Sequence, residues 1–126
     1  MIFTSSLPIA SGHKIETIGE LSHVVGDPSG LRFAVGSTVI IHSWGKVPFS
    51  SMKSMFRSCD VMILCDESPV FADGCTLRGM FTECARFNQD LSHWNTSNVT
   101  DMSHMFRGCT GFDRDISHWN TSKVTD

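Results

Sequence analysis

The chain has 126 residues, of which 40% are hydrophobic and 18% are charged, with a net charge of −3. This length suits one domain, and the acidic balance lacks the excess of Lys and Arg that neutralises phosphates, so no nucleic-acid partner is expected. No apolar run reaches the roughly 18 residues of a membrane span, so membrane insertion is not expected, and the abundant Phe, Trp and Met exclude a disordered chain.

The first 40 residues differ in composition from the rest. Strand-like stretches at 14–18, 31–35 and 37–44 are separated by 26–30, whose Pro and Gly favour a turn. We expect residues 1–40 to form a β-rich cap, because solenoids need covered ends for solubility, with an attachment arm for another protein as the alternative. The amino-terminal residues carry no basic segment before their apolar ones, so no secretory signal is expected.

From about residue 41 onward the chain repeats itself every 25 residues. The stretches 80–101 and 105–126 match at 14 of 22 positions, and Met55, Phe56 and Cys59 fall one period earlier. The copy between Cys59 and Cys75 is degenerate, since polar or cyclic residues occupy two of its apolar slots. Residues 41–126 are therefore predicted to form one repeat solenoid that ends at an incomplete repeat.

The first part of each period predicts a short helix. Apolar residues at 52, 55, 56 and 59 have the spacing of one helical face, and the copies at 77–84 and 102–109 repeat it. Ser51, Thr76 and Asp101 precede these segments, and all three residue types cap helix amino termini. We expect three helices of about two turns to begin there, with the methionines at 55, 80 and 105 in one column.

The second part of each period predicts a short strand and a polar corner. It reads Asp-[Leu/Ile]-Ser-His-Trp-Asn-Thr-Ser-x-Val-Thr at 90–100 and again at 115–125. Its Asn, Thr and Ser side chains can bond local backbone groups. A strand, corner and helix of 25 residues cannot close a core alone, but stacked copies can.

These residues resemble a known family. The string F-N-x-D-[IL]-S-x-W-[ND]-T-S-N-V-T-D-M-S-x-M-F-x-x-C, found at Phe87 to Cys109 and in part at Phe112 to Asp126, is similar to the bacterial surface-protein repeat of about 25 residues, of the BspA leucine-rich-repeat type. The resemblance implies an α/β fold, a short right-handed leucine-rich-repeat-like solenoid with parallel strands on one side and helices on the other. It also implies non-enzymatic adhesion and binding of proteins or glycans.

Candidate binding residues lie where polar side chains recur in two layers, on and beside the predicted strands. This side is the usual binding surface of solenoids. The predicted binding residues are Ser92, His93, Asn95, Ser117, His118 and Asn120. Stacked histidines with no carboxylate or thiol on the same face make a poor metal site, so no metal is predicted.

Other recurring residues are assigned to structure rather than chemistry. No catalytic motif is present, so we expect neither an enzyme nor a cofactor. Cysteines at 59, 84 and 109 are interpreted as buried thiols, with a metal site or redox pair as the alternative. Tryptophans at 44, 94 and 119 are interpreted as core residues, with a sugar-stacking platform as the alternative. Asp90 and Asp115 are interpreted as corner residues rather than an acid pair.

The last repeat predicts an interface. Asp126 occupies the position that helix-capping residues hold in the earlier repeats, so a further helix is expected after it. Without that helix, the apolar side chains of the last repeat are uncovered. The predicted interface residues are Phe112, Ile116, Trp119 and Val124. We expect a partner protein, either the same or a different subunit, to cover them, or the sequence to be a fragment of a longer array.

Two functions follow from these observations. The leading hypothesis is a protein-interaction or adhesion module that presents its polar repeat face at a cell or particle surface, to a protein or a glycan. The alternative is a virion structural component, such as a phage decoration, fibre or tail-associated subunit, that docks through the open carboxy-terminal repeat. A cell-surface or virion location is favoured by both.

Overall fold

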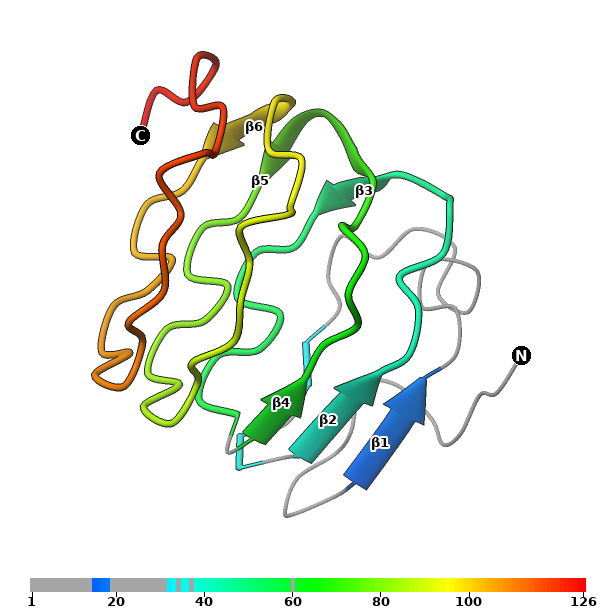
Figure 1. Ribbon diagram of the computed structural model, residues 1–126, viewed down its shortest axis with the longest axis vertical. Coiled ribbons are helices and arrows are strands. Elements are labelled where there is room, and N and C mark those ends of the chain that lie inside the picture. The colour runs from blue at the N-terminus through cyan, green and yellow to red at the C-terminus, as the bar shows by residue number, and fades with distance from the viewer. Residues whose placement is uncertain (1–14, 19–31, 34, 37, 60) are drawn as a thin grey trace.

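The computed structural model describes residues 15–18, 32–33, 35–36, 38–59 and 61–126. Their short strands form two parallel sheets, β1-β2-β4 and β3-β5-β6, and the chain passes from one sheet to the other within each coil (Figure 1). The strands are β1 (Ile15–Ile18), β2 (Thr38–Ile41), β3 (Phe49–Ser51), β4 (Val61–Ile63), β5 (Phe71–Thr76) and β6 (Val99–Asp101).

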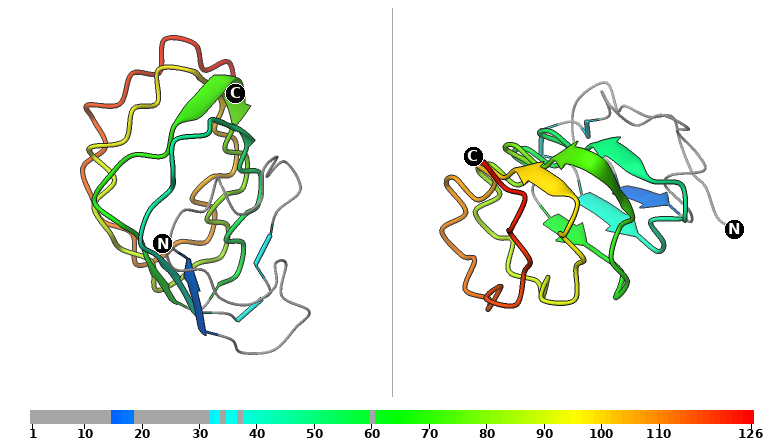
Figure 2. Two further views of the ribbon diagram at one scale, coloured as in Figure 1. Left: turned by 90° about the vertical axis from the view of Figure 1, so that its right-hand side faces the viewer. Right: turned by 90° about the horizontal axis from the view of Figure 1, so that it is seen from above.

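Neighbouring strands are about one repeat apart in the sequence. Thr38 of β2 pairs with Ile15 of β1 and with Val61 of β4, while Thr76 of β5 pairs with Ser51 of β3 and Asp101 of β6. Each period of the sequence is therefore one coil, and successive coils lie side by side (Figure 2). Most of the predicted cap at 1–40 lies outside the described residues, but β1 joins the same sheet as β2.

The predicted helices, and with them the α/β solenoid fold, are wrong, because no residue that the structure describes is helical. The segments 52–59, 77–84 and 102–109 are instead chains of consecutive turns, which we call turn ribbons. In the first ribbon, the N–H groups of Met55, Arg57 and Cys59 donate to the carbonyl three residues earlier, over 3.2, 3.2 and 3.0 Å. No helix in the described part is long and apolar enough to cross a membrane.

The turn ribbons replace helices because their backbone bonds run between coils. The N–H of Ser54 donates to the carbonyl of Arg78 over 2.9 Å, and that of Phe56 to Met80 over 3.0 Å. Ser54 and Ser58 have φ of 57°, a left-handed conformation that an α-helix does not contain. A two-turn helix is too short to be stable alone, whereas a ribbon bonded to the next coil satisfies its amides.

The same two positions of every ribbon take a positive φ, which fixes the ribbon shape. In the second and third ribbons the equivalent residues are Gly79, Glu83, His104 and Gly108, with φ of 62°, 61°, 58° and 76°. The apolar residues at i, i+3, i+4 and i+7 are buried in the first two ribbons, and in the third Met105 is buried while the other three are half-buried against the core. The predicted core stripe is therefore correct although the element is not.

The predicted capping residues close turns instead of helices. Ser51 Oγ accepts a hydrogen bond from the N–H of Lys53 over 3.2 Å, and Asp101 Oδ1 accepts one from Ser103 over 2.8 Å. Thr76 Oγ1 does the same for Arg78 over 3.1 Å. Each cap therefore turns the chain from a strand into the ribbon that follows it.

The core consists of side chains stacked in columns from coil to coil. The rings of Phe56, Phe81 and Phe106 stack with centroids 5.7 Å apart at each step, and Phe33 extends this column at 5.4 Å. The methionines at 55, 80 and 105 occupy one equivalent position and are all buried, as predicted. The three tryptophans are also buried, which confirms their assignment to the core: Trp44, Trp94 and Trp119.

The degenerate copy still forms a complete coil. Its apolar run supplies β4, and Pro69 is buried in the slot that holds tryptophan elsewhere. Beyond β4, the side chain of Gln89 accepts from the N–H of Leu64 over 2.9 Å and donates to the carbonyl of Met62. This amide thus pairs with β4 as a neighbouring strand would.

Candidate binding groove

Two adjoining hollows lie over the polar corners of successive coils. The first has a volume of about 560 Å³ and is lined by Asp90, Ser92, Arg114, Asp115 and His118. The second has a volume of about 460 Å³ and is lined by Leu64, Cys65, Asp66, Asn88, Gln89, Asp90, His93 and Arg114. Because Asp90 and Arg114 line both hollows, we treat them as one surface, the corner groove.

The carboxylates of the corner groove are held by the corners that they close. Asp90 Oδ1 accepts the N–H of Ser92, and Asp115 Oδ1 accepts the N–H of Ser117, each over 2.8 Å. Hydrogen bonds from the serine side chain and amide lower the pKa of each carboxyl, and the nearby histidine lowers it further. Both groups are exposed and remain ionised at neutral pH, and the corner interpretation of this pair is confirmed.

Arg114 brings the positive charge of the corner groove. Its Nε donates to the carbonyl of Asn88 over 3.1 Å, and the N–H of Asp113 donates to Asn88 Oδ1 over 2.8 Å. The arginine is therefore fixed against the preceding coil. Sequence reasoning missed it, although a signal existed: Arg114 stands in the slot that holds Gln89 one period earlier.

Three of the six predicted binding residues line the corner groove, and three do not. Ser92, His93 and His118 are lining residues, and both histidines are exposed. Asn95, Ser117 and Asn120 are not among the lining residues that the structure describes.

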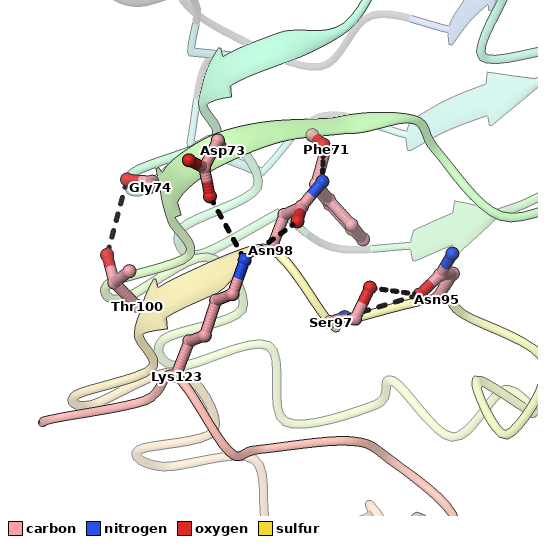
Figure 3. Close-up of polar contacts among 8 residues, drawn as sticks. All are labelled: Phe71, Asp73, Gly74, Asn95, Ser97, Asn98, Thr100 and Lys123. Carbon is pink, nitrogen blue, oxygen red and sulfur yellow. Dashed lines mark hydrogen bonds and ion pairs between the residues drawn. The ribbon is translucent and has the colours of Figure 1, made fainter.

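The two asparagines are turn residues. Asn95 Oδ1 accepts the hydroxyl of Ser97 over 2.8 Å and its N–H over 3.3 Å (Figure 3). Asn120 Oδ1 accepts the N–H of Ser122 over 3.0 Å in the next coil. Side-chain oxygens used in this way shape the corner and are less available to a ligand.

Further polar side chains join one coil to the next. Asn98 Nδ2 donates to the carbonyl of Phe71 over 3.1 Å, and Thr100 Oγ1 donates to the carbonyl of Gly74 over 3.2 Å (Figure 3). Lys123 reaches Asp73 over 3.3 Å, across two coils. These contacts are structural, since they connect backbone and side chains of successive coils.

The recurring cysteines lie in the ribbons and carry thiol groups. Cys84 Sγ donates to the carbonyl of Phe56 over 2.9 Å, and Cys109 Sγ to that of Phe81 over 2.7 Å. Burial raises the pKa of Cys59 and of Cys84 to about 12, so both are protonated at neutral pH. The buried-thiol interpretation is confirmed for these two, while Cys109 is half-buried. Within the described part of the chain, no cluster of His, Cys, Asp and Glu could hold a metal ion.

The predicted interface residues pack on the coil before them. Phe112 stacks on Phe87 at 5.8 Å, and Trp119 stacks on Trp94 at 6.4 Å while its Nε1 donates to the carbonyl of Leu91 over 2.8 Å. Phe112, Ile116 and Val124 are half-buried. Their covering by a partner protein stays a prediction.

The fold and the groove define a class of protein: a coil-repeat protein with a polar corner groove. Residues 50–126 match the family described as "Mycoplasma protein of unknown function, DUF285", and the chain belongs to this family. The matched residues include all three turn ribbons and every described residue that lines the corner groove. No curated protein and no solved structure matches the chain.

Proposed function

We propose that this protein is a non-enzymatic interaction module that works in adhesion at a cell surface and binds a partner protein through the corner groove. The observation that carries the proposal is the set of fixed charges in that groove. Asp90 and Asp115 are held by backbone amides, and Arg114 is held by a carbonyl of the neighbouring coil. Side chains held in this way lose little conformational entropy on binding.

The charges of the corner groove favour a basic partner segment. Three carboxylates, those of Asp66, Asp90 and Asp115, face one guanidinium, that of Arg114. Lys or Arg side chains of a partner would complement this excess of negative charge, and such complementarity sets specificity and the rate of association. The histidines at 93 and 118 add donors and acceptors beside the carboxylates.

Two observations favour binding over catalysis and a cell surface over a virion. The lowered pKa of Asp90 and of Asp115 makes each a poor general acid near neutral pH, and each already accepts a structural hydrogen bond. The family description names a cellular organism, which favours the cell-surface location. The virion role stays a prediction with no structural observation behind it.

The test compares charge-neutral variants in binding to cultured epithelial cells. The double variant Asp90→Asn/Asp115→Asn keeps an oxygen for each corner amide but removes both charges. We expect the labelled protein to bind about tenfold more weakly, a loss of about 1.4 kcal/mol, with a melting temperature only slightly below that of the parent protein, since an amide oxygen accepts the corner hydrogen bonds less strongly than a carboxylate. The matched control is Asp73→Asn/Glu83→Gln, which removes the same charge outside the groove and should bind like the parent protein.

A second pair of variants addresses the histidines. His93→Ala/His118→Ala should weaken cell binding, whereas His42→Ala, which alters an exposed histidine outside the groove lining, should not. Parent-like binding by both groove variants, or equal losses in groove and control variants, would contradict the proposal, because the groove would then have no specific part in binding.

A further inference from the structure

Another hollow lies over the three turn ribbons. Among the described residues, its lining shares none with the corner groove, so the following argument is independent of the proposed function. The hollow has a volume of about 200 Å³ and is lined by Ser54, Arg57, Arg78, Gly79, Thr82, His104 and Arg107. All three ribbons contribute to it, and we call it the ribbon pocket.

Positive charge is concentrated around the ribbon pocket. Arg57 and Arg107 occupy the same position of the first and third ribbons, on either side of Thr82 in the second. Coils stack at about 4.8 Å, so these two arginines start about 10 Å apart and can reach one ligand between them. Among the described lining residues there is no carboxylate. The three guanidinium groups repel one another, and an anion bound between them would relieve this repulsion.

Arg78 completes the set from the middle coil. Its Nη1 donates to Ser103 Oγ over 2.9 Å, and its charge also acts on Asp101, which lies outside the described lining. One hydrogen bond uses one of the five N–H donors of the guanidinium, so the group keeps donors for a ligand. The serine contact orients the side chain along the stack, toward the neighbouring coil.

Gly79 keeps the floor of the ribbon pocket open. A Cβ at this position would lie 3.2 Å from Thr82 Oγ1 and 3.3 Å from Ser54 Oγ, and the φ of +62° is one that other residues rarely adopt. The side chains of Ser54 and Thr82 are nearly buried, at 9% and 8% exposure. Thr82 Oγ1 already donates to the carbonyl of His104 over 2.8 Å, so the donors available to a ligand are mainly the guanidinium groups around the pocket.

We propose that the ribbon pocket binds one tetrahedral oxyanion, a sulfate or phosphate group, either as the free ion or as an ester on a sulfated polysaccharide. Arginine forks match the oxygen spacing of such groups and bind them through two parallel hydrogen bonds. The volume is smaller than the roughly 300 Å³ at which pockets begin to enclose whole organic ligands. It therefore suits a single charged group, with the rest of any larger ligand outside.

The test is titration calorimetry of the full chain with sodium sulfate, sodium phosphate and heparin. The variant Arg57→Gln/Arg78→Gln/Arg107→Gln keeps polar side chains but removes the three guanidinium groups and their charge. For every probe that binds the parent protein, we expect this variant to bind at least about tenfold more weakly. The control Lys46→Gln/Arg86→Gln/Lys123→Gln has the same net charge, alters no described residue that lines the ribbon pocket or the corner groove, and should stay within about twofold of the parent. Arg107→Gln alone alters one exposed side chain, and we expect it to bind these probes about threefold more weakly than the parent protein.

The three probes separate the two sources of the anion. Binding of heparin that depends on the arginines and is much tighter than binding of the inorganic ions supports the polysaccharide ester; comparable binding of the inorganic ions supports the free anion. Equal losses in the triple variant and its control, or no binding of any probe, would overturn the proposal. Asp90→Asn/Asp115→Asn should bind sulfate like the parent, so failure of the corner groove and failure of the ribbon pocket are distinguishable.

Discussion

Gln89 shows how one side chain can take the place of a strand. Its Oε1 and Nε2 pair with the N–H of Leu64 and the carbonyl of Met62, at the open edge of the β1-β2-β4 sheet. An unpaired strand edge is prone to pair with other chains. The Gln89 amide bonds to both of these backbone groups, so they are no longer available to pair with another chain.

We expect Gln89→Ala to lower the free energy of unfolding by about 1–2 kcal/mol, because it leaves the N–H of Leu64 and the carbonyl of Met62 without this partner. Urea denaturation measures this loss, and hydrogen exchange should show a faster amide at Leu64. Asn98→Ala is the comparison, since it removes one hydrogen bond to the backbone, that to Phe71, and should cost about half as much. Equal exchange rates at Leu64 in the parent and the variant would contradict this role.

Part of the corner groove could be read from the sequence, and part could not. The repeats at 90–100 and 115–125 pointed to Ser92, His93 and His118, because residues that recur on a polar corner share one surface. Asp66 and Arg114 were missed, since both depart from the repeat and periodicity favours the residues that match. Exceptions to a repeat, compared slot by slot, are the signal that would have found them.

At the scale of the element, the turn ribbon explains why the helices were mispredicted. A ribbon with left-handed residues every fourth position buries i, i+3, i+4 and i+7, the same set that a helix buries. Apolar spacing alone cannot separate the two. Gly79 and Gly108, inside the second and third predicted helices, were the available signal, because glycine weakens a helix and favours a positive φ.

The ribbon geometry predicts that one serine is better replaced by glycine. Ser58 has φ of 57°, and glycine occupies the equivalent slot at 108. We expect Ser58→Gly to raise the free energy of unfolding by about 0.5–1 kcal/mol, since relief of left-handed strain outweighs the entropy cost of glycine. Urea denaturation measures the change.

Ser122 provides the control for this substitution. It is exposed and is not among the residues with a positive φ, so Ser122→Gly should lower the free energy of unfolding by about 0.5 kcal/mol. The two glycine variants should therefore change stability in opposite directions. A loss of stability in both would mean that the ribbon conformation at Ser58 carries no strain.

At the scale of the whole molecule, thiols buried along the stack couple stability to pH. Burial raises the pKa of Cys59, Cys75 and Cys84 from 9.0 to about 12. In the unfolded chain these thiols ionise above about pH 9, whereas in the folded chain they stay protonated. Their contribution is therefore complete below pH 9 and is lost as the pH rises from 9 to 12.

We expect the free energy of unfolding to fall by up to about 1.4 kcal/mol per buried thiol for each pH unit in this range. Urea denaturation at pH 8, 9 and 10 measures the slope. Cys84→Ala should reduce the slope by about a third, because it removes one of the three thiols. Cys65→Ala removes a half-exposed thiol and should leave most of this pH dependence in place. A free energy of unfolding that does not change between pH 8 and pH 10 would contradict the burial of the three thiols.

The ribbon bonds also determine how the protein resists force. Four backbone hydrogen bonds join 52–59 to the neighbouring coil, and four more join 77–84 to the coil after it, all directed along the stack. When force is applied along the stack, the hydrogen bonds of one coil therefore break before the force reaches the next coil. The chain then extends in steps at low force. A pull across the coils loads the bonds of each ribbon together and meets high resistance. The direction of tethering thus decides whether the molecule behaves as an extensible spring or as a stiff link.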